Sequence, residues 1–287
     1  PMVAYVVVDG KTVMSGSRMT IIAGVFSICA ILCYIVCFKL TSERVEVPAS
    51  NQKVSASAIF KSIFTNKALL GIIVAAIFVL LSQLTVMSLA GYVYPNVYGS
   101  AAAQSTASLL GTVVMLVVCA PFASKLSAKL GKKELAMGSS IFSALVWLVC
   151  LIWRPASVWG FVACYILANI GMGFFNTIIW AMITDVIDDA EVRNGVREDG
   201  TIYSVYSFAR KLGQAFSSGL VGALLGIIGY TEATAFDPAV TRGIFNMACI
   251  APIIGFVCIV LALAFLYPLN KKKVEENVAE LAARRNK

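Results

Sequence analysis

The chain has 287 residues, of which 59% are hydrophobic and 13% charged, with a net charge of +8 and a mean hydropathy of +0.85. A soluble domain carries about 25% charged residues, so this composition excludes a soluble protein and predicts an all-α integral membrane protein in a lipid bilayer. The sequence contains no histidine, the commonest general base and metal ligand. We therefore expect neither an enzyme nor a metal site or other cofactor.

Seven apolar runs are long enough to cross a bilayer, which takes about 20 helical residues. Polar connections separate them and hold most of the charged side chains. The sequence predicts spans near residues 19–38, 68–92, 102–121, 136–153, 158–184, 201–229 and 243–267.

The chain opens at Pro1, and residues 1–17 are typical of the end of a loop outside the cell. We interpret residues 1–38 as this loop followed by the last helix of an N-terminal bundle. The odd number of spans fits a chain that begins after the earlier helices of that bundle. The sequence therefore predicts a partner, the missing N-terminal bundle of the same protein.

Residues 39–67 form the longest polar connection and are predicted to be a cytoplasmic linker to a six-helix bundle at 68–267. Within the linker, four apolar residues share one helical face opposite Lys61. They are Ile59, Phe60, Ile63 and Phe64. This pattern indicates either a short amphipathic helix on the inner membrane surface or an extension of the next span.

The distribution of positive charge predicts the orientation, because cytoplasmic connections are rich in Lys and Arg. The connections at 39–67, 122–135 and 185–209 and the tail at 268–287 hold 17 of the 23 Lys and Arg residues, and the alternating connections hold 4. We therefore expect a multi-pass protein of the inner membrane with a basic cytoplasmic C-terminal tail. The net charge follows from this topology, and no nucleic acid partner is needed to explain it.

The sixth predicted span contains two adjacent cations, Arg210 and Lys211. A charge at this depth costs about 2.5–3.5 kcal/mol unless it has a partner or faces water, and no acid lies inside any predicted span. Polar residues accompany the two cations at helical spacing on this span and on the fifth. They are Tyr203, Tyr206, Ser207 and Gln214 on the sixth, and Asn176 and Trp180 on the fifth. These residues predict a substrate and cation pathway whose acidic partner lies in protein outside this sequence.

The connection after the fifth span is dense in both signs of charge. Asp185, Asp188 and Glu191 recur every three residues at the end of a helix, where the helix dipole disfavours carboxylates. Arg193 and Arg197 are candidates to offset this charge, and the loop with Lys125 and Lys132 adds further cations. The alternatives are a solvated loop or a cytoplasmic gate of ion pairs that break when the inner side opens.

These motifs resemble the glycoside–pentoside–hexuronide:cation symporters, the melibiose-carrier-like members of the major facilitator superfamily. Three segments carry the resemblance, together with the Gly-Lys-Lys turn at Gly131. The segments are WAMITDVIDDAE at 180–191, GVREDG at 195–200 and YSVYSFARKLG at 203–213. The resemblance implies that the seven spans are helices 6–12 of a twelve-helix fold with sugar and cation sites between its two bundles.

The resemblance also implies roles for individual residues. Lys211 is expected to face an acidic cation site on helix 2 of the absent half, and Asn176, Tyr206 and Ser207 to line the sugar cavity. Asp185, Asp188, Glu191 and Arg197 correspond to an inner charge network. Arg210 beside Lys211 departs from the family pattern and favours an anionic sugar such as a hexuronide.

The sequence thus predicts secondary transport of a sugar or glycoside, such as a hexuronide or pentoside, coupled to Na⁺ or H⁺ by alternating access. One alternative is a carrier of lipids, lysolipids or other small solutes from the same superfamily, against which the polar stripes argue. The other is a non-functional transporter fragment. Since one helix of the first bundle and six of the second cannot enclose a pathway, we expect no transport by residues 1–287 alone.

Overall fold

The computed structural model describes residues 5–8, 11–14, 16–41 and 66–285. They belong to two units, divided between Lys53 and Val54, and each unit is described by itself. The predicted amphipathic segment at 59–64 and most of the predicted linker lie outside the described residues.

The first unit contains a β-hairpin and one long helix. Strands β1 (Tyr5–Val8) and β2 (Lys11–Met14) pair antiparallel, with Val8 opposite Lys11 beside the turn. The sequence predicted only a loop here, although the valine-rich strands have high β-propensity. Helix α1 (Gly16–Leu40) follows and is apolar on all sides, which is typical of a membrane span.

The second unit is a bundle in which helices α3 to α9 supply six spans and α10 follows at the C-terminus. Two π-helical turns, η1 and η2, extend α3 and join α4 to α5. The elements are α3 (Lys67–Tyr92), η1 (Val93–Val97), α4 (Ala101–Val114), η2 (Met115–Cys119), α5 (Ala120–Leu130), α6 (Lys132–Trp153), α7 (Val158–Asn194), α8 (Asp199–Ile228), α9 (Pro238–Phe265) and α10 (Lys271–Arg285).

Among the described residues, seven helical segments are long and apolar enough to cross a membrane, which confirms the predicted number. Their ends differ from the prediction in one important place. Helix α7 continues ten residues beyond 184, to Asn194, and carries Asp185, Asp188 and Glu191 on its last turns.

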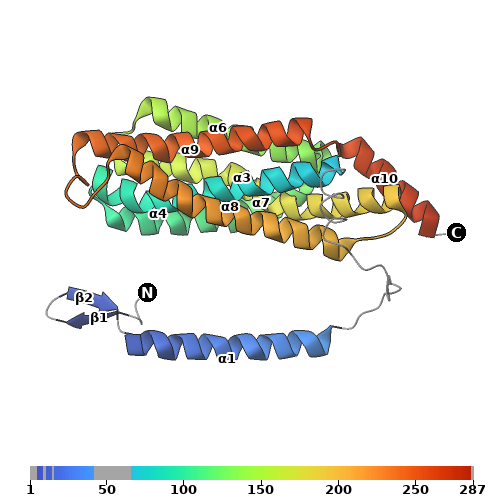
Figure 1. The fold of residues 1–287 in the computed structure, drawn as a ribbon, viewed down its shortest axis with the longest axis horizontal. Helices are drawn as coiled ribbons and strands as arrows, with labels where there is room; N and C mark the ends of the chain where they lie inside the picture. Colours follow the sequence, from blue (N-terminus) through green and yellow to red (C-terminus); the bar gives the residue numbers. More distant parts are fainter. Residues whose placement is uncertain (1–4, 9–10, 15, 42–65, 286–287) are drawn as a thin grey trace. The chain divides into compact units, whose positions relative to one another are not determined.

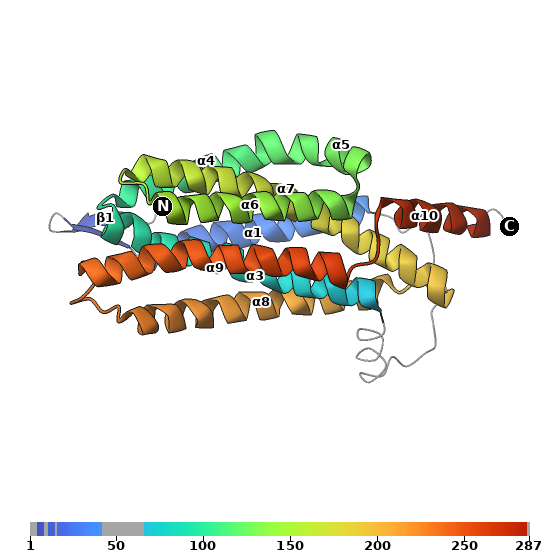
Figure 2. The same ribbon diagram turned by 90° about the horizontal axis from the view of Figure 1, so that it is seen from above.

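The helices of the bundle lie side by side in an order that differs from the chain order. Figure 2 shows the succession α8, α3, α9, α6, α7 and α4, and contacts join each neighbouring pair. The core includes small side chains such as Ala75 and Ala76 of α3, both fully buried. Small residues let helix backbones approach closely, which is the main source of packing energy between helices in lipid.

The contact between α6 and α7 depends on Gly171. A methyl group at this position would overlap the backbone carbonyl of Ser139 and the hydroxyl of Ser143, which donates to the Ala168 carbonyl at 2.8 Å. We expect Gly171→Ala to lower the free energy of unfolding by about 1–3 kcal/mol through overpacking. Thermal unfolding in detergent measures this, with Gly138→Ala on the open side of α6 as the matched control. Equal melting temperatures of the two variants would contradict the close contact.

One end of the bundle carries its basic connections and α10, and we call it the basic end (Figure 1). The sequence predicted a basic tail after residue 267, and the structure forms most of it into α10. Asn277 of α10 is buried and donates to Asp189 of α7 at 3.0 Å, and Leu281 is also buried. Arg284 donates to the Val192 carbonyl at 3.0 Å. Helix α10 thus packs on the last turns of α7 and satisfies carbonyls that the helix end leaves free.

Candidate substrate face and charge cluster

Six of the eight polar residues predicted on α7 and α8 form a surface in this unit that is at least partly exposed. We call it the cationic face and define it by Trp180, Tyr203, Ser207, Arg210, Lys211 and Gln214. Trp180 is 49% exposed and Tyr203 is 39% exposed, and Lys211 is exposed as well. Exposed polar and cationic side chains midway along a membrane helix require contact with water or with further protein.

Arg210 is held by aromatic rings. Its guanidinium carbon lies 5.3 Å from the ring centroid of Trp180 and 5.7 Å from that of Tyr206. Nη1 also donates to the Tyr206 hydroxyl at 3.3 Å. Such cation–π contacts contribute about 0.5–2 kcal/mol each. They hold the guanidinium on the cationic face and leave part of its hydrogen-bonding capacity unused.

Lys211 forms no ion pair with any residue in the described part of the chain. Its ammonium group donates to the Gln214 side chain at 3.2 Å, one turn along α8. A neutral amide compensates less of the charge than a carboxylate does. Within the described residues, the charge of Lys211 therefore remains largely uncompensated, as the sequence predicted.

The structure places Tyr206 and Asn176 differently from the other residues of the predicted pathway. Tyr206 is fully buried, and its ring meets Trp180 edge to face at 5.6 Å between centroids. Asn176 is half-buried and donates across to Gln83 of α3 at 3.3 Å. In this conformation Tyr206 packs beneath Trp180 and Arg210. Asn176 links α7 to α3.

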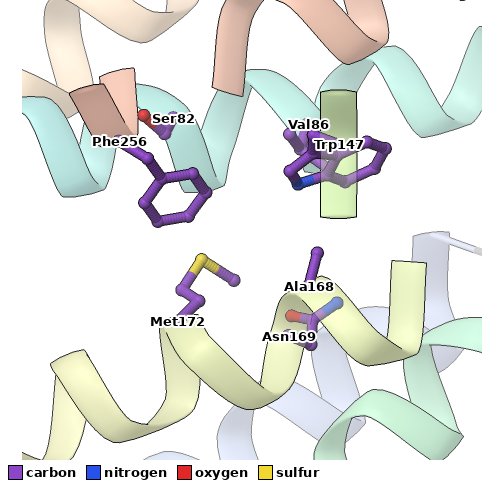
Figure 3. Close-up of a pocket in the computed structure, with 7 residues that line it drawn as sticks. All are labelled: Ser82, Val86, Trp147, Ala168, Asn169, Met172 and Phe256. Atoms are coloured by element: carbon purple, nitrogen blue, oxygen red, sulfur yellow. The ribbon is translucent and has the colours of Figure 1, made fainter. Parts of the chain in front are cut away.

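Inside the bundle, the cavity between α3, α6, α7 and α9 is small. Figure 3 shows its lining, with Ser82 and Phe256 on one side and Met172 and Asn169 on the other. The cavity has a volume of about 10 Å³. This is close to the least space that a single water molecule needs, so a sugar does not fit there.

A second group of charged residues surrounds the end of α7. We call it the charge cluster and define it by Lys132, Asp185, Asp188, Asp189, Glu191, Arg193, Arg197 and Asp199. The Lys132 ammonium group donates to Asp185 at 2.6 Å, and Asp185 is only 5% exposed. Arg193 pairs with the buried Asp189 at 2.9 Å, one turn away on the same helix.

Arg197 is the centre of the cluster. Its Nη1 donates to Asp188 at 2.9 Å and to Glu191 at 2.8 Å, and its Nε donates to Asp199 at 2.8 Å. Partial burial lowers the pKa of Arg197, but the hydrogen bonds to Glu191, Asp188 and Asp199 outweigh it and raise the pKa above its usual value. The guanidinium therefore stays charged and links the last turns of α7 to the first residue of α8.

A glycine makes this link geometrically feasible. Gly195 follows α7 with φ of +74°, a left-handed conformation that favours glycine. The chain reverses there, and Arg197 points back to the carboxylates of the helix that has just ended. The cluster is thus built on the last turns of α7 and a short turn of defined conformation.

The structure therefore joins Lys132, Asp185, Asp188, Glu191, Arg193 and Arg197 into pairs, as the sequence suggested for the two arginines. Lys125 is exposed and has no ion pair with a described residue. Sequence reasoning missed Asp189, Asp199 and Asn277. The spacing of Val274, Asn277 and Leu281 on one face of the tail was the available signal for α10.

Comparison with known proteins identifies relatives of this chain. The chain is 28% identical over 264 residues to the "Glucuronide carrier protein homolog" of Escherichia coli, covering 91% of this chain and 56% of that protein. It is 29% identical to the "Uncharacterized symporter YjmB" of Bacillus subtilis, covering 91% and 57%. It is 28% identical to the "Putative sulfoquinovose importer" of Salmonella typhimurium, covering 92% and 56%.

The chain thus spans little more than half the length of these relatives, all of which are named as transporters. A protein-family model described as MFS/sugar transport protein matches residues 2–271. This family consists of transporters, in agreement with the prediction that the chain is not an enzyme. The chain belongs to the MFS/sugar transport protein family, and is a multi-pass membrane protein of the major facilitator type.

Proposed function

We propose that this chain is the C-terminal portion of a secondary carrier that moves a sugar or glycoside across the inner membrane. The relatives support this class of substrate, since two of them are named for a glucuronide and for sulfoquinovose. Transport proceeds by alternating access, in which two bundles move around a central site. The N-terminal bundle supplies the other wall of that site.

The observation that carries the proposal is the cationic face. Arg210 and Lys211 lie near the middle of α8 on the cationic face. Neither forms an ion pair with an acid among the described residues. Charged residues inside membrane proteins usually face a water-filled pathway or a charged partner. Packing a second bundle against this face would enclose a polar cavity next to Trp180, whose exposed ring offers an apolar surface for a sugar to stack on.

The same face favours a sugar that carries a negative charge. Arginine recognises carboxylate and related oxyanions through paired N–H groups, and Arg210 is already oriented by Trp180 and Tyr206. Glucuronides carry a carboxylate and sulfoquinovose carries a sulfonate, so the names of both relatives fit this chemistry. We therefore propose a hexuronide or another acidic sugar as the substrate class.

We further propose that Na⁺ or H⁺ is co-transported, and that Lys211 helps to couple its movement to that of the sugar. An acid from the N-terminal bundle would bind the cation and also approach Lys211. Cation and sugar then stabilise the same closed arrangement, a coupling that is typically about 1–3 kcal/mol.

Uptake by the complete carrier tests these proposals. With its N-terminal bundle present and reconstituted in proteoliposomes, the carrier should accumulate a labelled glucuronide when a Na⁺ or pH gradient is imposed. Lys211→Ala should reduce gradient-driven uptake by about 5- to 150-fold, which corresponds to the loss of a coupling of about 1–3 kcal/mol. The matched control is Lys67→Ala, which removes an exposed lysine at the start of α3.

Unchanged uptake by Lys211→Ala would contradict the role of Lys211 but would not contradict the proposed sugar substrate. Competition by lysolipids and not by sugars would contradict the sugar substrate itself. Proteoliposomes that contain only residues 1–287 should show no flux, since the second wall of the pathway is absent.

A further inference from the structure

The end of the bundle opposite the basic end has a pocket of about 350 Å³. Residues of η1, of the α6–α7 connection and of the start of α9 line it, including Tyr98, Arg154, Thr241, Arg242 and Phe245. It lies entirely within the second unit, remote in sequence from the cationic face on α8. An inference about this pocket is therefore independent of the proposed transport function.

Both cations at this end of the bundle line the same pocket. From residue 66 to residue 285, the connections and helix ends on this side contain only two Lys or Arg residues, Arg154 after α6 and Arg242 in the first turns of α9. Positive charges are rare on this side, because the opposite side of a membrane protein collects them. The presence of two such charges at one pocket is not explained by membrane topology and indicates a local role for them.

Neither arginine is neutralised by an acid within the described residues. Arg154 donates from Nη2 to the amide oxygen of Asn246 at 3.1 Å, and both guanidinium groups are exposed. The acids of the connection that precedes α9 are Glu232 and Asp237, and neither forms an ion pair with Arg154 or Arg242. The pocket thus has two guanidinium groups with free N–H donors.

The backbone at Arg154 also points to a role for its side chain. Arg154 is the C-cap of α6, directly after Trp153, with φ of +49°, and it is the one residue other than glycine with positive φ in the described part of the chain. A side chain in this conformation costs about 1–2 kcal/mol relative to glycine. Glycine is the usual residue at this position of a helix end, so the arginine side chain must offset this cost by another contribution.

Two tryptophans flank the Arg154 turn, which forms part of the pocket lining. Trp153 ends α6 and Trp159 begins α7, and both are more than half exposed on either side of the Arg154 turn. Tryptophans that face lipid concentrate at the boundary between hydrocarbon and water. The Arg154 turn, which lines the pocket, is therefore expected at the depth where phospholipid phosphates lie.

We propose that Arg154 and Arg242 bind the phosphate group of a membrane phospholipid in this pocket. Guanidinium groups bind phosphate through paired, charge-assisted hydrogen bonds. The partly exposed side chains of Val97 and Tyr98 line the pocket and provide apolar surface for the glycerol backbone, and the volume suits a headgroup. The bound lipid would hold together the ends of α3, α6 and α9.

Titration with a short-chain phosphatidylglycerol, followed by native mass spectrometry of residues 1–287 in a glycoside detergent, tests the site. One lipid should bind, and diacylglycerol of the same chain length, which lacks phosphate, should not. The double variant Arg154→Gly, Arg242→Gln should weaken binding about a hundredfold or more, since each arginine loses at least one hydrogen bond to a charged group, which contributes about a factor of ten. Glycine is chosen at 154 because it suits the positive φ.

The matched control is Lys67→Gln with Lys129→Gln, which removes two exposed charges at the basic end and should leave binding of this lipid unchanged. Far-UV circular dichroism verifies that each variant is folded, and the two single variants replace the double variant if it is not. Equal binding by the wild type and a folded variant that lacks either arginine overturns the proposal. So does inorganic phosphate or glucuronate that competes with the lipid at equal concentration, because the ligand would then be a soluble anion.

Discussion

Replacing Lys132 with methionine should cause the largest loss of stability among single substitutions in the charge cluster. Lys132 holds the carboxylate of Asp185 at 2.6 Å, and that carboxylate is almost completely buried. Methionine removes the compensating charge and leaves the acid where water cannot reach it. Breaking a buried ion pair in this way costs about 3–5 kcal/mol.

A double-mutant cycle separates this effect from a general loss of packing. Lys132→Met with Asp185→Asn removes both charges and should recover most of the lost free energy of unfolding, since the acid no longer needs a partner. Unfolding is measured in detergent by heat or by denaturant. Lys129→Met, an exposed lysine on the preceding helix, is the control and should change little. Additive effects of the two substitutions would show that the pair contributes nothing to stability.

On the hypothesis that the charge cluster is a gate that closes the basic end, replacing Arg197 with glutamine should weaken the closed arrangement and reduce transport. Arg197 bridges two acids on α7 and one on α8, and without it three carboxylates face one another. We expect the equilibrium between closed and open arrangements to shift by about 2 kcal/mol, or roughly thirtyfold, towards the open one. In the complete carrier, the accessibility of an engineered cysteine at this end reports the shift, and sugar uptake reports its consequence.

Arg197→Lys keeps the charge and loses the forked geometry of the guanidinium. Its cysteine accessibility and its sugar uptake should therefore lie between those of the wild type and of Arg197→Gln. Lys272→Gln removes an exposed charge at the same end of the bundle and is the control. If Arg197→Gln leaves both cysteine accessibility and uptake at wild-type values, the charge cluster is structural and does not act as a gate.

The number and type of the membrane elements could be predicted from the sequence, because each span is one continuous apolar run. The ends of the spans were harder to predict. Helix α7 runs on to Asn194 although its last turns are charged, because Lys132, Arg193 and Arg197 compensate its acids. Hydropathy values describe each residue separately and do not include the effect of these ion pairs.

The tail after residue 267 shows the same limitation. Its high charge masks a narrow buried face, on which Asn277 bonds to Asp189 and Leu281 packs against the bundle. Because the receiving surface belongs to α7, nearly ninety residues earlier in the chain, the tail alone gives only a weak helical pattern. The hairpin before α1 was similarly hidden in a segment that resembled a loop.

Within the candidate site, the sequence placed the predicted residues on the same helices but did not determine the direction in which each side chain points. Arg210 and Lys211 are adjacent in sequence, yet α8 directs Arg210 onto Trp180 and leaves Lys211 exposed beside Gln214. Tyr206, predicted to line the cavity, is buried beneath these residues. Successive residues on a helix are about 100° apart around its axis, so the neighbouring helices decide which of them face a pathway.

By itself, the sequence determined that this is a helical membrane protein with charged residues inside a span. Burial in lipid requires long apolar helices, so a charged residue within an apolar run is easily recognised. The tertiary structure alone decided the ion-pair partners, such as Lys132 with Asp185, and the meeting of Arg154 and Arg242 at one pocket. These residues are separated by 53 and 88 positions along the chain. Their proximity depends on helix packing, which acts between surfaces and leaves no local pattern in the sequence.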